Sequence, residues 1–133
     1  MKIALCGSVS FAKKIIKIKG ELTDLGFDVV APANIDVYAD GKIKVEDKWK
    51  KLESDVLRNY AGEIKKSDAV LIVNQKKNDI ENYIGGNSLI EMAFAYVNEK
   101  KIYLLNPIPK MAYSDEIGAM KPTVINGDLS KVK

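Results

Sequence analysis

The sequence has no histidine and only one cysteine, and these shortages exclude several kinds of chemistry. Without histidine there is no Ser–His–Asp or Cys–His catalysis and no imidazole acid or base. A single cysteine, Cys6, allows no intrachain disulfide, and the lack of histidine also removes the usual zinc sites. We therefore expect no metal and no cofactor, so that any catalysis uses carboxylates, lysines, tyrosines, hydroxyls or backbone amides.

Arginine and long apolar runs are also scarce. Of the 21 basic residues, set against 18 acidic ones, only Arg58 is an arginine. Specific recognition of bases favours the forked guanidinium group, so we expect no specific nucleic-acid partner. No apolar run approaches the ~18 residues of a membrane span, and Ile3 to Cys6 is too short for the hydrophobic region of a signal peptide. We expect a cytoplasmic protein without a membrane partner.

The 133 residues suffice for one hydrophobic core, and we predict a single domain over 1–133. Short apolar runs rich in branched residues alternate with helical patterns, which is typical of parallel strands joined by crossover helices. The third run is continuously hydrophobic and so belongs in the middle of the sheet. The expected strands are Lys2 to Cys6, Phe27 to Ala31, Asp68 to Asn74, Lys101 to Leu105 and, more weakly, Pro122 to Ile125.

Apolar residues at spacings of three and four predict the intervening helices. The third of them is apolar almost all round, so we expect it to be buried on several sides, or on one side by a partner subunit. A long loop from Pro32 to Lys44 precedes the second helix, and such loops are often functional. The expected helices are Phe11 to Leu25, ended by Gly26, then Val45 to Ile64, Leu89 to Val97 and the shorter Ser114 to Met120.

The simplest assembly of these elements is a flavodoxin-like three-layer α/β/α sandwich with a parallel sheet of order 2-1-3-4-5. Ligands of open α/β sheets bind at the carboxyl ends of the strands, where the strand order reverses. In this order the reversal lies between the first and third strands. The loops that follow Cys6 and Asn74 are therefore the expected binding site, with Asn74 among its residues.

The first of these loops is Gly7-Ser8-Val9-Ser10. Gly7 allows a tight turn, the hydroxyls of Ser8 and Ser10 can donate hydrogen bonds, and the helix that follows presents free N–H groups. A phosphate or a carboxylate would fit this turn. Alternatively, one serine simply caps the helix, as serines commonly do.

The second loop leads through Gly85, Gly86, Asn87 and Ser88 to Glu91. Glu91 is the only charged residue between positions 84 and 98. A carboxylate among apolar neighbours carries a desolvation penalty, so its presence indicates a partner or a chemical task. The alternative is a capping box, in which Ser88 is the N-cap residue and Glu91 bonds back to the Ser88 N–H.

Two functions that this topology supports fit the sequence poorly. A phosphoacceptor receiver domain needs an aspartate at the end of the third strand, where this chain has Asn74. A flavin-binding protein is expected to place aromatic residues around the ring, and the two loops offer only Phe11 and Tyr83. The flavin alternative is weak but open.

Two segments carry a resemblance to a known family. Leu5-Cys6-Gly7-Ser8 and the run from Gly86 to Ala95 resemble the nucleoside 2-deoxyribosyltransferase superfamily, which includes the 2′-deoxynucleoside 5′-monophosphate N-hydrolases. Members have a Cys-Gly-Ser type turn after the first strand. They also have a hydroxyl residue three positions before a glutamate, with small residues two and four positions after it. Ser88, Glu91, Ala93 and Ala95 occupy those places.

The resemblance implies an enzyme in which Glu91 attacks the anomeric carbon of a deoxyribose while the base departs. It implies that Gly7, Ser8 and Ser10 hold a 5′-phosphate, and that Asn74 and the residues from Gly85 to Ser88 complete the site. The implied partner is a small-molecule nucleoside or nucleotide, and the implied assembly is a homodimer or larger homo-oligomer.

Three family helper positions differ in this chain. Gly85 stands where the family often has an aspartate, Tyr60 where the hydrolases have another, and Ala4 where a tyrosine is common. Asp36, Asp40 or Asp79 are the candidate substitutes. The second hypothesis is therefore a non-catalytic module that binds a nucleotide-derived ligand in the same pocket, and a third is an interaction protein with a well-capped helix.

Overall fold

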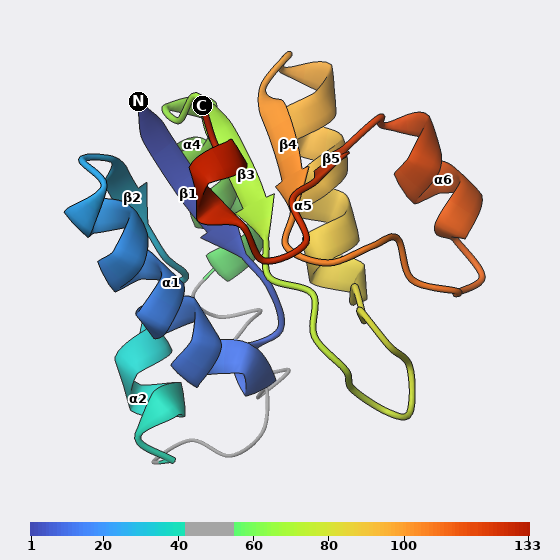
Figure 1. Ribbon diagram of the computed structural model, residues 1–133, viewed down its shortest axis with the longest axis horizontal. Helices are drawn as coiled ribbons and strands as arrows, with labels where there is room; N and C mark the ends of the chain where they lie inside the picture. Colours follow the sequence, from blue (N-terminus) through green and yellow to red (C-terminus); the bar gives the residue numbers. More distant parts are fainter. Residues whose placement is uncertain (42–54) are drawn as a thin grey trace.

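The computed structural model describes residues 1–41 and 55–133. They form a five-stranded, all-parallel sheet in the order β2-β1-β3-β4-β5 (Figure 1). The five predicted strands and their order are thereby confirmed. The strands are β1 (Lys2–Cys6), β2 (Asp28–Val30), β3 (Ala69–Ile72), β4 (Lys101–Leu104) and β5 (Thr123–Val124).

Helices cover both faces of the sheet (Figure 1). The α-helices are α1 (Ala12–Asp24), α2 (Ile35–Ala39), α4 (Val56–Lys65), α5 (Gly86–Val97) and α6 (Ser114–Ala119). Two short 3₁₀ helices, η1 (Val9–Phe11) and η2 (Leu129–Lys131), lie before α1 and near the C-terminus. The three-layer α/β/α arrangement of a flavodoxin-like fold is present.

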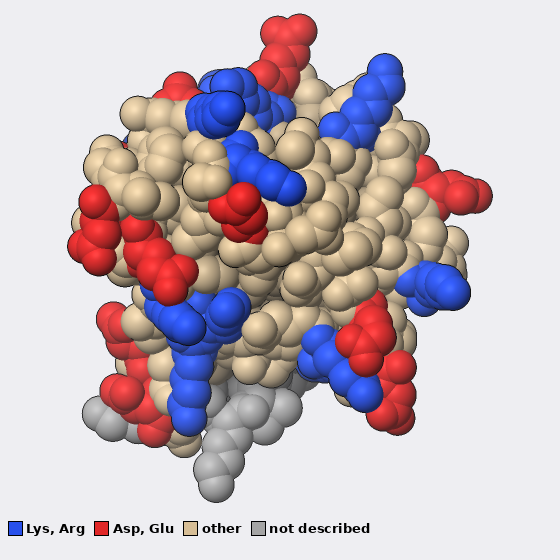
Figure 2. All heavy atoms as spheres, viewed as in Figure 1, with Lys and Arg blue, Asp and Glu red and all other residues tan. Residues whose placement is uncertain are grey.

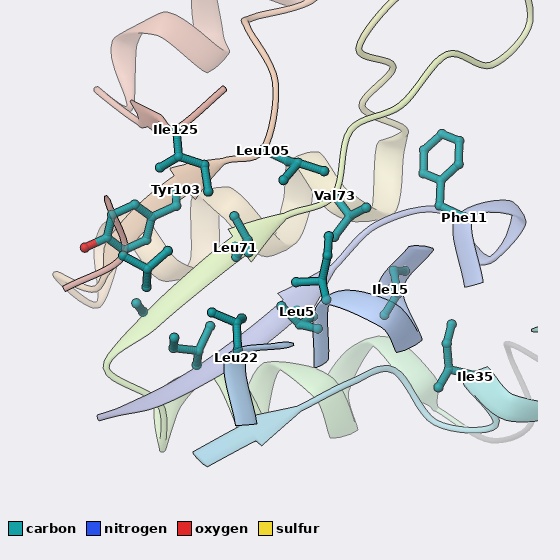
Figure 3. Packing of buried hydrophobic residues seen from close by; sticks show 14 of the residues in the cluster. Leu5, Phe11, Ile15, Leu22, Ile35, Leu71, Val73, Tyr103, Leu105 and Ile125 are labelled. Atoms are coloured by element: carbon teal, nitrogen blue, oxygen red, sulfur yellow. The ribbon is translucent and has the colours of Figure 1, made fainter. Parts of the chain in front are cut away.

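Successive side chains of each strand point to opposite faces, so the sheet divides the apolar residues into two layers. On one face Leu5 and Leu71 pack against Ile15 and Leu22 of α1 (Figure 3). On the other face α4 and α5 cover the alternate residues, and Cys6 lies in that second layer with Met92 of α5. The strand order thus brings α1, α4 and α5 to the carboxyl ends of β1 and β3.

Some predicted boundaries were wrong. The loop expected from Pro32 to Lys44 contains α2, whose Ile35 is buried in the layer beneath α1. Leu25, expected on the buried stripe of α1, is 59% exposed because it follows the last turn of the helix. Of the second predicted helix, α4 confirms the part from Val56 on, and residues 42–54 lie outside the described residues.

The third predicted helix begins earlier than expected and is not covered on all sides. It starts at Gly86 instead of Leu89. Met92 and Ala95 are fully buried, but Ile90, Tyr96 and Val97 are exposed. Burial on several sides within one chain was therefore a wrong expectation, and a partner subunit against the outer side of α5 stays a prediction.

The surface in Figure 2 carries both signs of charge. Lysine and arginine side chains are interspersed with aspartate and glutamate on this face, which is the usual pattern of a solvated surface. Within residues 1–41 and 55–133, no helix combines the length and the apolar character that a membrane span needs.

Gly7 sets the distance between the two loops at the carboxyl edge. A Cβ atom at this position would lie 2.9 Å from the carbonyl oxygen of Val73, a backbone atom that cannot move aside cheaply. The amide of Val73 donates to the carbonyl of Cys6 at 2.7 Å, so the segments that follow β1 and β3 are hydrogen bonded to each other just before Gly7. Only glycine fits this close approach.

We predict that Gly7→Ala destabilises the protein by about 1–3 kcal/mol, because the methyl group would overlap the Val73 carbonyl. The control is Gly86→Ala in the first turn of α5, where no atom of the described residues lies within 4 Å of the added Cβ and alanine is the better helix former. Urea unfolding of both variants measures the difference. Equal stability of the two variants would contradict the role given to Gly7.

Candidate functional site

A cavity of about 1290 Å³ lies at the carboxyl edge of the sheet, beside α1, α2, α4 and α5. It sits at the reversal of strand order between β1 and β3, as the fold predicts. All but one of the site residues expected from the sequence line it. They are Gly7, Ser8 and Ser10 from the first loop, and Gly85, Gly86, Asn87, Ser88 and Glu91 from the second loop and α5.

The exception is Asn74, which is fully buried and does not line the cavity. Its Nδ2 donates to the carbonyls of Asn106 at 2.9 Å and Pro107 at 3.1 Å, and its Oδ1 accepts from the Asn106 N–H at 2.9 Å. Asn106 Nδ2 donates in turn to the Asn74 carbonyl at 2.8 Å. Asn74 therefore connects the segment after β3 to the segment after β4. It positions these loops and does not make the contact with a ligand that the sequence predicted.

Ser8 has both a capping role and a place in the cavity. Its Oγ accepts from the Ser10 N–H at 3.3 Å and so caps η1, as the simpler interpretation of this turn predicts. The same oxygen lies 2.7 Å from Ser10 Oγ. It also accepts a hydrogen bond of 2.9 Å from Lys77 Nζ. The cap thus leaves the turn able to present hydroxyl groups to the cavity.

The capping box predicted as the alternative role of Glu91 is wrong. The helix α5 begins at Gly86 with Gly85 as its N-cap residue, and glycine has no side chain that could accept a capping hydrogen bond. Ser88 is therefore the third residue of the helix, and Glu91 lies in its second turn. From there a side chain cannot reach back to the first N–H group of the helix. Glu91 faces the cavity instead.

Two neutral, buried groups lie behind Glu91. The thiol of Cys6 is fully buried and lies beside the Glu91 carboxylate, which acts on it electrostatically. Burial raises the pKa of this thiol well above its usual value, and the negative charge of Glu91 raises it further. Burial likewise raises the pKa of Tyr60, with additional contributions from Cys6, Glu91 and Glu63. At neutral pH, Glu91 thus has uncharged groups behind it and the cavity in front.

Tyr60, at a family helper position, is committed to the fold. Its hydroxyl donates to the Leu5 carbonyl and lies 3.3 Å from the Val30 carbonyl, so it links α4 to β1 and β2. None of the aspartates at positions 36, 40 and 79 lines the cavity. Among the described residues, Glu63 is the other carboxylate that does, and its Oε2 lies 3.6 Å from Lys2 Nζ.

The sequence analysis missed Lys77, which lines the cavity and reaches Ser8. Its ammonium group also lies 5.4 Å from the centre of the Tyr83 ring. No lysine was among the site residues predicted from the sequence, because lysines occur throughout the chain and mostly lie on solvated surfaces. The sequence feature that could have indicated the position of Lys77 is Asn78-Asp79, because such a pair between two extended residues favours a tight hairpin. The structure has this hairpin, with Lys77 and Ile80 paired across it.

The described residues contain no group of three or more side chains placed to hold a metal ion. No family model matches the chain, and no curated protein matches it.

We predict that the free energy of unfolding falls as the pH rises above about 9, because folded Cys6 and Tyr60 keep protons that the unfolded chain releases near its ordinary values of 9.0 and 10.0. In Tyr60→Phe the decline above pH 10 should be shallower by up to about 1.4 kcal/mol per pH unit. Denaturant unfolding between pH 7 and pH 11 measures the slopes. A Tyr60→Phe slope equal to that of the wild type would contradict the role given to Tyr60.

Proposed function

We propose that the protein is an enzyme of the N-glycosidic bond, a hydrolase or transferase acting on (deoxy)nucleosides or their 5′-monophosphates. The nucleophile is Glu91. The observation that carries the proposal is a carboxylate that lines a large cavity at the carboxyl edge of the sheet, beside the buried Cys6 thiol. A cytoplasmic location agrees with such substrates.

The chemistry needs only a carboxylate and water. A Glu91 oxygen attacks the anomeric carbon as the C–N bond breaks, and the bonding electron pair leaves with the base, which takes a proton from water in the open cavity. The negative charge of Glu91 stabilises the oxocarbenium-like transition state. Water then cleaves the glycosyl ester, giving hydrolysis, or a second base attacks it, giving transfer.

The lining of the cavity suits a sugar and a base. Phe11, Tyr38 and Tyr83 offer rings on which a base can stack, and the amides of Gln75 and Asn87 can hydrogen bond to its edge. At Gly86, no atom of residues 1–41 and 55–133 lies within 4 Å of the position of a Cβ, which leaves room for a sugar at this part of the cavity. Gly7, Ser8 and Ser10 hold the 5′-phosphate.

We predict that Glu91→Gln lowers the rate of base release by about 10³-fold or more, because the amide keeps the size of the side chain and loses its nucleophilicity. The control is Glu99→Gln, which removes an exposed carboxylate just beyond the end of α5. Chromatography of free base from a panel of nucleosides and monophosphates measures the rates. Full activity of Glu91→Gln on a substrate that the wild type cleaves would refute the mechanism.

A second candidate is a binding module that senses a nucleotide-derived ligand without turnover. It is favoured by Tyr60, which stands at a helper position with its hydroxyl proton directed at the Leu5 carbonyl. A shift of the melting temperature with a nucleotide, without release of base over many hours, would identify this function.

We also infer that two copies of the chain pair through the outer side of α5, as a dimer or as part of a larger homo-oligomer. Ile90, Tyr96 and Val97 expose 50%, 46% and 72% of their surface on this helix. The patch carries no charge, since the one acid of the segment, Glu91, faces the cavity. An uncharged apolar patch can meet its own copy across a two-fold axis without like-charge repulsion.

We predict that Val97→Lys converts the assembly to monomers, because each interface would then bury a lysine. The control is Leu25→Lys, which changes an exposed apolar residue at the end of α1, away from the patch, and should leave the assembly intact. Sedimentation velocity measures both. A wild-type protein that is monomeric at micromolar concentration would contradict the pairing.

A further inference from the structure

Lys77 connects the two loops at the carboxyl edge of the sheet. It follows β3, and its ammonium group donates to Ser8 Oγ, which follows β1, at 2.9 Å. Both residues line the cavity. A cation therefore lies at the serine turn, although the sequence of that turn contains none.

The position of Lys77 is fixed by its hairpin. The Lys77 N–H donates to the Ile80 carbonyl at 3.0 Å, and the Ile80 N–H donates back at 2.9 Å. Asn78 and Asp79 supply the two positive φ angles, 52° and 61°, that such a two-residue turn requires. The Tyr83 N–H closes the loop on the Gln75 carbonyl at 2.8 Å, and the Tyr83 ring lies beneath the ammonium group. The cation is thus held in place before a ligand arrives.

The hydrogen bonds at Ser8 determine which protons are available to a ligand. Ser8 Oγ accepts from the Ser10 N–H and from Lys77 Nζ, which uses both of its lone pairs. Its own proton is then directed to Ser10 Oγ at 2.7 Å. Ser10, which is exposed to the cavity, keeps its hydroxyl proton for an acceptor, and Lys77 keeps two of its three N–H groups. The cluster therefore presents one hydroxyl proton and two ammonium protons to an anionic ligand.

Charge is distributed unevenly around the cavity. Lys13 and Lys14, in the first turn of α1, line it along with Lys77, whereas Glu63 and Glu91 line it from α4 and α5. No carboxylate of the described residues forms an ion pair with Lys77, while its neighbour Lys76 pairs with Glu81 at 3.6 Å. A ligand with an anionic end is therefore oriented with that end at Lys77.

We propose that Lys77 is the specificity-determining residue of this site, binding a phosphate monoester together with Ser10, whose hydroxyl group Ser8 orients, and so selecting nucleoside 5′-monophosphates over nucleosides. This inference rests on the proposed function. A monoester offers three acceptor oxygens to the donors of the cluster. A neutral nucleoside leaves the same donors without a charged partner. The site therefore binds the monophosphate more tightly than the nucleoside.

The test compares Lys77→Met with Lys76→Met, which removes the same charge from the neighbouring residue. Lys77→Met is expected to lower kcat/KM for a 2′-deoxynucleoside 5′-monophosphate by roughly ten- to a hundredfold and to leave the matching nucleoside unchanged. Lys76→Met should change neither. Lys77→Gln, which keeps a polar side chain on the hairpin, replaces Lys77→Met if that variant melts well below the wild type.

A second measurement does not need turnover. Calorimetric titration of the same monophosphate into Glu91→Gln, with and without Lys77→Met, is expected to show a ten- to hundredfold weaker Kd in the double variant. If base is released equally from nucleoside and monophosphate and Lys77→Met changes neither, the inference is overturned while the glycosidic activity stands. If no base is released but binding of the monophosphate depends on Lys77, the proposed activity fails and the phosphate site stands.

Discussion

The contact between Gly7 and the carbonyl of Val73 is the constraint on which the candidate site depends. Because Gly7 has no Cβ atom, the turn after β1 packs directly against the backbone at the end of β3. The Asn74 and Asn106 side chains then tie the end of β3 to the chain after β4. The backbone contact at Gly7 and the buried amide side chains together fix the loops that carry Ser8, Lys77 and the start of α5, so the cavity is shaped by contacts at the end of the sheet.

The cavity combines two environments that the fold keeps apart. Near Ser8 the lining offers hydroxyl groups and an ammonium group, and the hydrogen bonds among them direct protons outward. Near Glu91 the lining is acidic, and the protonated Cys6 and Tyr60 lie in the apolar layer behind it. The serine turn and α5 belong to opposite faces of the sheet, and only the reversal of strand order brings them to one opening.

Hydrophobic patterning predicted the sheet because burial on both faces leaves a continuous apolar run, as in β3. It also placed Glu91 at the site, since a lone charge in an apolar helix is visible in the sequence. It did not reveal that α5 starts at Gly86, because glycine is a poor helix former and local preference favours Ser88 as the cap. It missed Lys77, because a lysine looks the same in sequence whether it faces solvent or is aimed by a hairpin. Asn74 was misassigned because its partners follow a strand distant in the sequence.

The buried thiol of Cys6 can report on local opening of the core, because it is the single cysteine of the sequence. Cys6 belongs to β1 and is fully buried beneath α5, so an alkylating reagent reaches the sulfur only when the strand and the helix separate. The rate of labelling therefore reports how often this part of the core opens, without interference from a second cysteine. A ligand that holds Glu91 in the cavity would slow that opening, which makes the native cysteine a built-in probe of occupancy.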